Sequence, residues 1–248
     1  MAVQFKQDRD DREQIIQNYT QVLERMATAA REVGRDPQTV RLVVVTKGHS
    51  LQITRAVASA GAHILGENYV EEAIPKIQEL SGEFELEWHM IGHVQSRKAR
   101  PVCEHFAYVH TVDSLKLAER MDRFAAELGK SIPILLECNI SQEESKFGWK
   151  AWEEDEWDYL AEEITPLLDL KHLRIRGLMT MPPFFADPEE TRPYFQRLRH
   201  LAGFLALRFP QVDWAELSMG MSNDFEIAIQ EGATMVRVGT AILGERLR

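Results

Sequence analysis

The stretch RLVVVTKGHSLQITRAVASAG, residues 41–61, joins a short apolar run to a segment with helical periodicity. The run (41–47) is rich in β-branched residues, which favour strands, and the segment that follows (50–61) repeats apolar residues at helical spacing. The same alternation recurs seven more times toward the carboxyl terminus. The further strand-like runs are HILGEN (63–68), LEWHMIGHV (86–94), FAYVHTVD (106–113), IPILLECNIS (132–141), LRIRGLMTM (173–181), DWAELSMGM (213–221) and ATMVRVGT (233–240).

Strands that alternate with helices predict a parallel sheet. The runs are mostly continuous rather than alternating, as expected for strands that are covered on both faces. Eight such units in 248 residues match the length of a (β/α)8 TIM barrel, which is typically about 250 residues. We therefore expect a single α/β domain over 1–248, with an N-terminal helical region (1–40) and a barrel (41–248). A doubly wound open sheet is the alternative.

A long helix is predicted before the barrel, from about residue 10 to Val33. Gly34 and Pro37 are expected to end it. Its apolar residues form a single stripe, which favours packing on the barrel over a dimer surface. The residues of the stripe are Ile15, Tyr19, Val22, Met26, Ala30 and Val33.

Composition excludes several classes of protein. The net charge of −10 argues against nucleic acid and anionic membranes as main partners. The chain has no apolar run of about 18 residues, as a membrane span would require. The N-terminal stretch MAVQFKQDRDDREQ has no apolar core before a cleavage site, so we expect no secretory signal. Two distant cysteines, Cys103 and Cys138, form no disulfide framework and indicate a reducing compartment. We expect a cytoplasmic monomer with inert thiols.

Lys47 ends a run that is otherwise apolar. Side chains alternate along a strand, so Val43, Val45 and Lys47 share one face. In a barrel this face can be the lumen, and Lys47 then lies at the carboxyl-terminal mouth, where the active sites of this fold lie. The sequence therefore predicts Lys47 as a site residue.

The last strand contributes an arginine to the same face. Met235 and Arg237 share a face there, as do Leu135 and Glu137 in the fifth strand. A lysine and an arginine at one low-dielectric mouth repel, which lowers the pKa of the lysine and makes it a nucleophile for an aldehyde. A purely structural pair of Arg237 with Glu137 is the alternative.

The segment SMGMS (218–222) and the dipeptide Gly239–Thr240 follow the seventh and eighth strands. Barrels often bind phosphate in these two loops. Ser218 and Ser222 supply hydroxyls, and Asn223 followed by Glu226 resembles a helix N-cap with its return partner. The sequence predicts a phosphate site with Ser218, Gly239 and Thr240.

A nucleophilic lysine and a phosphate site together suggest a phosphorylated aldehyde. Pyridoxal 5′-phosphate (PLP) fits, and a phosphorylated sugar in an aldolase fits almost as well. Arg237 favours PLP, because a guanidinium can donate to a pyridine nitrogen but holds its own proton.

The chain resembles the pyridoxal-phosphate homeostasis protein family, whose members are single-domain barrels related to the N-terminal domain of alanine racemase. The resemblance covers nearly all of the chain from residue 41 onward. The motifs that carry it are VVVTKG (43–48), LGENYVEEA (65–73), EWHMIGHVQSRKAR (87–100), VHTVDSLKLAERM (109–121), NISQEESKFG (139–148), IRGLMTM (175–181) and LSMGMSNDFEIAIQEGATMVRVGTAILGER (217–246).

The resemblance implies a role for several residues. Lys47 would hold PLP as an internal aldimine, a Schiff base, and Arg237 would face the pyridine nitrogen. Asn68 would lie beside the cofactor, and Lys146 matches a second lysine that helps to handle it. Ser218, Gly239 and Thr240 would hold the phosphate. The family implies PLP buffering and amino-acid balance, possible transfer to PLP-dependent apoenzymes, and no robust catalysis.

A PLP-dependent racemase or lyase is the alternative function. Racemisation needs a second acid or base, and Tyr69 is a candidate, although a tyrosine at a helix start more often packs. A third class, a zinc site, is suggested by His89 and His93, but their segment is predicted to be a strand rather than the helix that zinc pairs favour.

One stretch, WKAWEEDEWDYLAEE (149–163), departs from the barrel pattern. It holds three of the five tryptophans, and seven acidic residues fall between 153 and 163. A solvated helix face with tryptophans packed beneath it is one interpretation, and a partner-docking surface is the other.

Overall fold

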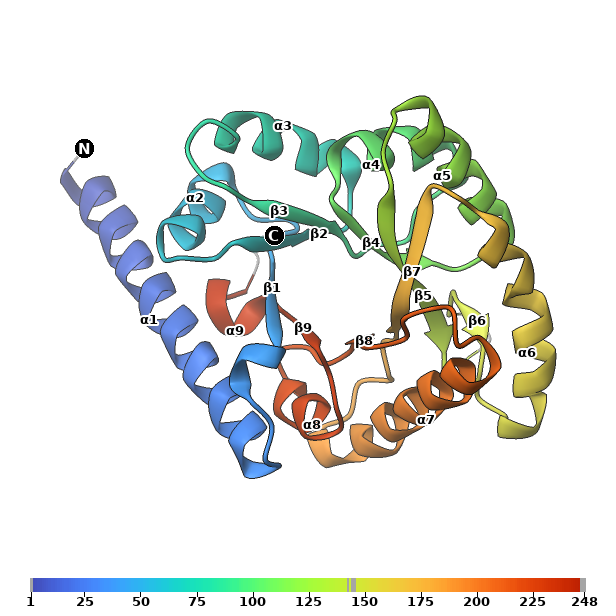
Figure 1. Ribbon diagram of the computed structural model, residues 1–248. Coiled ribbons are helices and arrows are strands. Elements are labelled where there is room, and N and C mark those ends of the chain that lie inside the picture. The colour runs from blue at the N-terminus through green and yellow to red at the C-terminus, as the bar shows by residue number, and fades with distance from the viewer. Residues whose placement is uncertain (1, 142, 144–145, 246–248) are drawn as a thin grey trace.

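The chain folds into a closed barrel of parallel strands (Figure 1). The computed structural model describes residues 2–141, 143 and 146–245, with side chains from residue 12 onward. Its barrel strands are β1 (Arg41–Val45), β2 (Ile64–Glu67), β3 (Glu87–Met90), β4 (Tyr108–Val112), β5 (Ile132–Asn139), β7 (Leu173–Met179), β8 (Glu216–Ser218) and β9 (Met235–Val238). Neighbouring strands pair in chain order, β1 pairs with β9, and β4 pairs with β5, so no barrel edge stays open. The predicted TIM barrel is confirmed and the open sheet is wrong.

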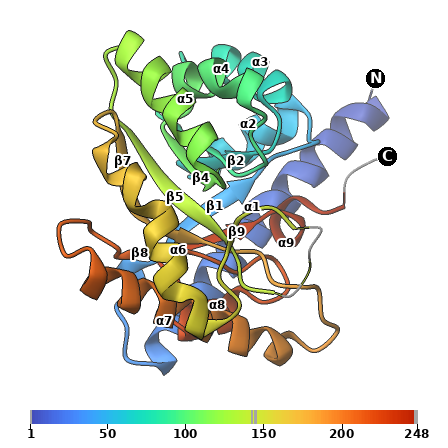
Figure 2. The ribbon, with the colours of Figure 1, turned by 90° about the vertical axis from the view of Figure 1, so that its right-hand side faces the viewer.

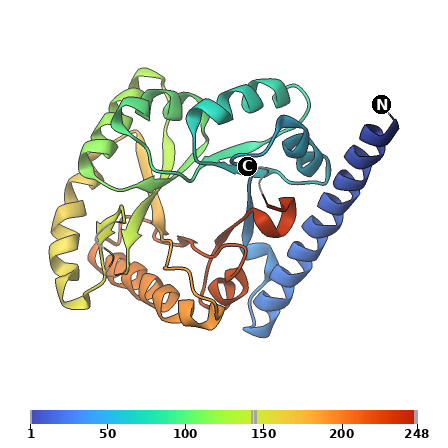
Figure 3. The ribbon, with the colours of Figure 1, turned by 180° about the vertical axis from the view of Figure 1, so that it is seen from behind.

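The strands are linked by helices on the outside of the barrel (Figure 3). Serine caps begin two of them, where Ser50 and Ser114 accept from backbone N–H groups three residues later. The α-helices are α2 (Leu51–Ser59), α3 (Val70–Leu80), α4 (Ala99–His105), α5 (Leu115–Glu127), α6 (Trp157–Ile164), α7 (Arg192–Arg208), α8 (Phe225–Gln230) and α9 (Thr240–Leu243). The 3-10 turns are η1 (Pro37–Thr39), η2 (Ser96–Lys98), η3 (Glu154–Glu156), η4 (Thr165–Asp169) and η5 (Pro188–Thr191).

The first helix, α1 (Ala2–Glu32), lies along the outer side of the barrel (Figures 1 and 3). It contacts α2, α8 and α9, and the hydroxyl of Tyr19 donates to the Gly61 carbonyl at 3.1 Å. The predicted stripe is buried except at Val33, which is 45% exposed because the helix ends at Glu32 and Gly34 turns the chain with a φ of 70°. The expectation that this helix packs on the barrel is confirmed. The expectation that Val33 belongs to its buried stripe is wrong.

The lumen holds its own apolar layer, separate from the larger core between strands and helices. Its buried members are Val43, Ile91, Tyr108, Leu135, Met179 and Met235. Strand alternation predicts the inward position of Val43, Leu135 and Met235, which the structure confirms. Lys47 and Arg237 lie beyond this layer, toward the carboxyl ends of their strands.

The tryptophan-rich stretch forms a short strand, a 3-10 turn and most of α6, and its seven acidic residues between 153 and 163 are exposed. Figure 2 turns this side of the molecule, with α6 and α7, toward the viewer. The short strand β6 (Trp149–Lys150) pairs with the end of β5. Trp149 and Trp157 are buried and donate to backbone carbonyls, while the guanidinium of Arg197 stacks on Trp152 at 4.3 Å. These contacts support the first interpretation of the stretch.

Candidate functional site

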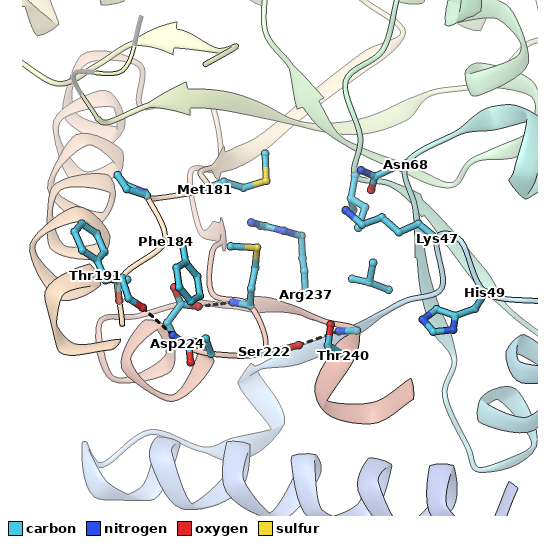
Figure 4. A pocket seen from close by; sticks show the side chains of 17 residues that line it. Lys47, His49, Asn68, Met181, Phe184, Thr191, Ser222, Asp224, Arg237 and Thr240 are labelled. Carbon is cyan, nitrogen blue, oxygen red and sulfur yellow. Dashed lines mark hydrogen bonds between the residues drawn. The ribbon is translucent and has the colours of Figure 1, made fainter. Parts of the chain in front are cut away.

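A cavity of about 290 Å³ lies at the carboxyl ends of the strands, where barrels of this fold place their active sites (Figure 4). The loops after β1, β2, β7, β8 and β9 all contribute to its lining. The lining residues are Val45, Lys47, His49, Asn68, Ile91, Met181, Pro183, Phe184, Phe185, Thr191, Met221, Ser222, Asn223, Asp224, Arg237, Gly239 and Thr240.

Five of the six residues expected from the sequence line this cavity, namely Lys47, Asn68, Arg237, Gly239 and Thr240. Figure 4 shows Lys47 and Asn68 entering from the same side, with Arg237 between them and the loop of Ser222. The sixth, Ser218, is not in the lining: it is fully buried in β8 and lies beneath Arg237.

The turn that carries Lys47 is fixed by buried polar groups. Thr46 donates to Oε1 of Glu67 at 2.6 Å, and Nζ of Lys76 donates to the same oxygen at 2.7 Å. Nζ of Lys76 also donates to the Thr46 carbonyl at 2.8 Å. Burial raises the pKa of Glu67, which the adjacent Lys76 counteracts. These contacts hold the backbone immediately before Lys47.

The turn continues through Gly48, whose φ of 71° is the left-handed conformation that glycine adopts without strain. The Gly48 N–H donates to Glu72 at 3.0 Å, so α3 holds the turn on both sides of Lys47. Strand alternation predicts the direction of Lys47, whereas only the tertiary structure shows this support from α3.

Arg237 is buried and anchored at two points. Its Nη1 donates to Oγ of Ser218 at 2.6 Å, and its Nη2 donates to the Thr180 carbonyl at 2.8 Å. Burial lowers its pKa to about 10, so it stays protonated at neutral pH. Among the described residues, Glu137 is not one of its hydrogen-bond partners, although the two charges interact at longer range. The geometry does not support a structural Arg237–Glu137 pair.

Ser222 ties the loops after β8 and β9 together. Its Oγ accepts from the N–H groups of Gly239 and Ala241, each at 3.3 Å. A Cβ at Gly239 would lie 3.2 Å from the Val45 carbonyl oxygen, so glycine lets this backbone pass close to β1. The hydroxyl at this loop junction therefore belongs to Ser222 rather than to Ser218.

The prediction that Asn223 is the N-cap of the helix after β8 is wrong. The N-cap of α8 is Asp224, whose carboxylate accepts from the Met221 N–H at 2.6 Å. Glu226 does not return to the cap, because it pairs with Arg25 of α1. The ion pair of Glu226 with Arg25 thus joins α8 to α1.

Sequence reasoning missed one wall of the cavity. Met181 and the segment 183–185 follow β7 and bring two phenylalanines to the site, of which Phe184 is 85% exposed. An aromatic pair after two prolines, directly beyond a strand end, is the signal that could have identified this wall. His49 also lines the cavity, two residues after Lys47.

The alternative site residues lie elsewhere. Tyr69 is 56% exposed and outside the cavity lining. His89 is buried in the lumen, whereas His93 pairs with Asp113 at 3.0 Å and stacks on Phe147. Within the described residues, no group of three or more potential metal ligands is present.

Lys146 reaches the rim of the cavity. Its Nζ donates to the carbonyl of Met181 at 3.2 Å and pairs with Glu143. Three residues of its motif, 142, 144 and 145, lie outside the described residues. The role of Lys146 in cofactor handling stays a prediction.

The groups around the cavity suit a phosphorylated pyridine aldehyde. Lys47 supplies a primary amine, Arg237 supplies N–H donors, and the loops after β8 and β9 supply the hydroxyl-bearing residues Ser222 and Thr240. Oδ1 of Asn68 is buried at the cavity without a hydrogen-bond partner among the described residues, so it can accept from a ligand hydroxyl. The residues present therefore fit PLP.

Comparisons with known proteins agree with this geometry. Residues 11–246 match the family described as alanine racemase, N-terminal domain. The pyridoxal phosphate homeostasis protein of Escherichia coli K12 is 42% identical over 239 residues, covering 94% of this chain and 97% of that protein. The structure of PipY from Synechococcus elongatus with PLP bound is similar with a TM-score of 0.77 and 39% identity, over 90% of this chain and 100% of that chain.

Alanine racemase from Streptomyces coelicolor is a more distant neighbour. Its TM-score is 0.66 at 16% identity, over 93% of this chain and 58% of that chain, which shows a shared fold alone. The barrel, the family match and the relatives at about 40% identity agree, and the chain belongs to the pyridoxal phosphate homeostasis protein family, within the alanine racemase N-terminal domain family.

Proposed function

We propose that this protein binds PLP covalently through Lys47 and acts in intracellular PLP homeostasis and amino-acid balance. The observation that carries the proposal is the convergence of the amine of Lys47, the guanidinium of Arg237 and the hydroxyl-bearing residues Ser222 and Thr240 on one cavity of about 290 Å³. The PLP-bound structure of PipY, at 39% identity, supports the same ligand.

In this proposal each end of the ligand has its own residues. PLP supplies an aldehyde that reacts with a primary amine, and Lys47 is the amine that lines the cavity. Arg237 donates to the ring nitrogen, and Asn68 accepts beside the ring. Gly239 and Thr240, with the hydroxyl of Ser222, hold the phosphate, and Ser222 takes the place that the sequence suggested for Ser218.

We favour a carrier over an enzyme. Tyr69, the candidate for a second base, is exposed and outside the lining of the cavity. Arg237 keeps its proton at neutral pH, so it leaves the ring nitrogen unprotonated and the ring a weak electron sink. Both features disfavour proton exchange at the α-carbon of an amino acid.

The cellular setting is part of the same proposal. Cys103 and Cys138 are free and buried, and burial raises the pKa of Cys103 to about 12. Within the described residues, none of the helices is long and apolar enough to cross a membrane. These features suit a cytoplasmic protein, and PLP-dependent apoenzymes are the partners to which it would deliver the cofactor.

The test uses the purified chain of 248 residues and added PLP. We expect a visible absorbance band that sodium borohydride removes, with the reduced cofactor found on Lys47 by peptide mass spectrometry. Lys47→Ala should lose the band and the adduct. Lys146→Ala is the matched lysine control and should keep the adduct on Lys47. A wild-type protein that takes up no PLP would contradict the proposal.

A second measurement separates carrier from enzyme. Amino acids are incubated with the PLP-loaded protein in deuterium oxide, and deuterium at the α-carbon is followed by NMR. We expect no exchange above that of free PLP. Rapid uptake that disappears in Lys47→Ala would favour the racemase or lyase alternative.

A further inference from the structure

A continuous chain of hydrogen bonds runs through the barrel lumen and ends at Arg237. Oγ of Ser218 lies 2.6 Å from Nη1 of Arg237 and 2.9 Å from Nδ1 of His110. Nε2 of His110 lies 2.9 Å from Nδ1 of His89. Nε2 of His89 lies 2.8 Å from Oε1 of Glu87. Four bonds thus join β9, β8, β4 and β3 across the inside of the barrel.

The two ends of this hydrogen-bond chain, Arg237 and Glu87, lie at opposite ends of the barrel. Arg237 lines the cavity at the carboxyl ends of the strands. Glu87 begins β3 and lines a second cavity, of about 700 Å³, at the amino ends. Ser218, His89 and His110 are fully buried, whereas the Glu87 side chain is 43% exposed. The hydrogen-bond chain therefore links the buried guanidinium of Arg237 to the carboxylate of Glu87 at the amino ends of the strands.

Chemistry fixes the direction of every bond in this chain. An arginine only donates and an ionised carboxylate only accepts. Glu87 therefore accepts from Nε2–H of His89, and Nδ1 of a neutral His89 accepts from Nε2–H of His110. Nδ1 of a neutral His110 then accepts from the hydroxyl of Ser218, which itself accepts from Arg237. Both imidazoles are thereby held as Nε2–H tautomers.

The electrostatics agree with neutral imidazoles. Burial lowers the pKa of His89 and lowers that of His110 well below its usual range. The hydrogen bond from His89 lowers the pKa of Glu87, which keeps the carboxylate ionised as an acceptor. Each buried group in the chain has a partner, so the network has a single satisfied arrangement.

We propose that Ser218 and His110 are positioning residues for Arg237, and that Glu87 sets the direction of the hydrogen-bond chain that orients its guanidinium toward the ring of the bound cofactor. The part concerning the cofactor rests on the proposed function, whereas the tautomers are a property of the ligand-free protein. Ser218 and the Thr180 carbonyl hold the two Nη atoms, so the plane of the guanidinium is fixed before a ligand arrives. Further N–H groups of the same guanidinium can donate into the cavity.

The first test is 15N NMR of the ligand-free protein with labelled histidine. We expect His89 and His110 to show protonated Nε2 and unprotonated Nδ1 at neutral pH. Glu87→Lys, at a part-exposed position that tolerates a longer side chain, replaces the terminal acceptor by a donor and should abolish the Nε2–H preference of His89. His93→Gln serves for assignment and should leave both tautomers unchanged. An Nδ1–H or doubly protonated ring at either position in the wild-type protein would overturn the proposal.

The second test measures PLP binding. Ser218→Ala should shift the absorbance maximum of the bound cofactor and weaken its affinity by about tenfold, the effect of losing one hydrogen bond to a charged group. Thr54→Ala removes another fully buried hydroxyl, which donates to the Ser50 carbonyl, and should leave the spectrum unchanged. Circular dichroism establishes that each variant is folded.

The outcomes separate the two proposals. If the wild-type protein takes up no PLP, the proposed function fails, and the NMR experiment alone decides the hydrogen-bond chain. If the wild-type protein binds PLP and folded Ser218→Ala keeps its spectrum and affinity, the positioning role is wrong. If Ser218→Ala does not fold, Glu87→Lys takes its place in the binding test, with the same spectral shift expected and an unchanged spectrum counting against the proposal.

Discussion

Nζ of Lys76 lies 2.7 Å from Oε1 of Glu67, in a site where the Glu67 side chain is fully buried and that of Lys76 is 9% exposed. The same nitrogen donates to the carbonyl of Thr46, the residue before Lys47. A buried ion pair on the outer face of the sheet therefore holds the backbone immediately before Lys47.

We predict that Lys76→Met destabilises the fold by about 3–5 kcal/mol, because it leaves the buried Glu67 carboxylate without its cation. Urea denaturation measures the change. Lys98→Met, which breaks the exposed pair with Glu71, is the matched control and should cost less than about 1 kcal/mol.

The double variant Glu67→Leu/Lys76→Met separates stability from positioning. It should recover most of the stability, because no buried charge is left unpaired. It should still bind PLP more weakly than the wild-type protein, since the Thr46 carbonyl has lost its donor. Full recovery of both properties would show that the pair has no influence on Lys47.

Ser222→Ala should weaken PLP binding by about tenfold, because the hydroxyl that joins the amides of Gly239 and Ala241 is removed. Pyridoxal, which lacks the phosphate, is the control ligand and should bind the variant and the wild-type protein equally. Fluorescence titration gives both affinities. Equal weakening of the two ligands would place Ser222 away from the phosphate.

Gly177→Ala should destabilise the barrel by at least about 3 kcal/mol. A Cβ at Gly177 would lie 1.9 Å from the Glu216 carbonyl oxygen, and its φ of 150° disfavours side chains. Because β7 pairs with β8 at these two residues, the substitution separates two barrel strands.

Gly203→Ala is the matched control for this substitution. Gly203 lies inside α7 with nothing near its missing Cβ, so alanine should stabilise the helix by about 0.5–1 kcal/mol. The midpoint temperature of thermal unfolding should therefore fall in Gly177→Ala and rise in Gly203→Ala, each relative to the wild-type protein. A Gly177→Ala protein as stable as the wild type would contradict the close strand pairing.

Stability should fall as the pH rises because of Glu137. Burial, reinforced by Asp113 and opposed by Arg237, raises its pKa from 4.5 to about 7. Between these values the folded protein holds a proton that the unfolded chain releases, so this contribution is complete below about pH 4.5 and is lost by about pH 7. At ~1.4 kcal/mol per pKa unit, the loss amounts to about 3 kcal/mol.

Glu137→Gln removes this titration. The free energy of unfolding of the variant, relative to that of the wild-type protein, should rise by about 3 kcal/mol between roughly pH 4.5 and pH 7.5. Urea denaturation at both pH values gives the difference. A constant difference between the two proteins would show that Glu137 is ionised throughout.

Much of the site could be predicted because strand alternation is a local property. Val43 and Met235 face the lumen as their spacing predicts, and Lys47 and Arg237 follow at the mouth. Ser218 could not be assigned in this way, because it and Ser222 lie in one short segment and both carry hydroxyls. Only the partners of Ser218, which come from β4 and β9, distinguish its buried position from a phosphate contact.

The sequence by itself determined the order of strands and helices, the parallel sheet and the residues that begin each loop at its mouth, because hydrophobic periodicity and turn residues act over a few positions. The pairing of β1 with β9, which closes the sheet into a barrel, excluded the open alternative only in the tertiary structure. The tertiary structure decided which polar groups meet. Lys76 reaches Thr46 across 30 positions and His110 reaches Ser218 across 108. Hydrogen bonds depend on distances of about 3 Å between atoms, and only the closed barrel brings these residues within that range.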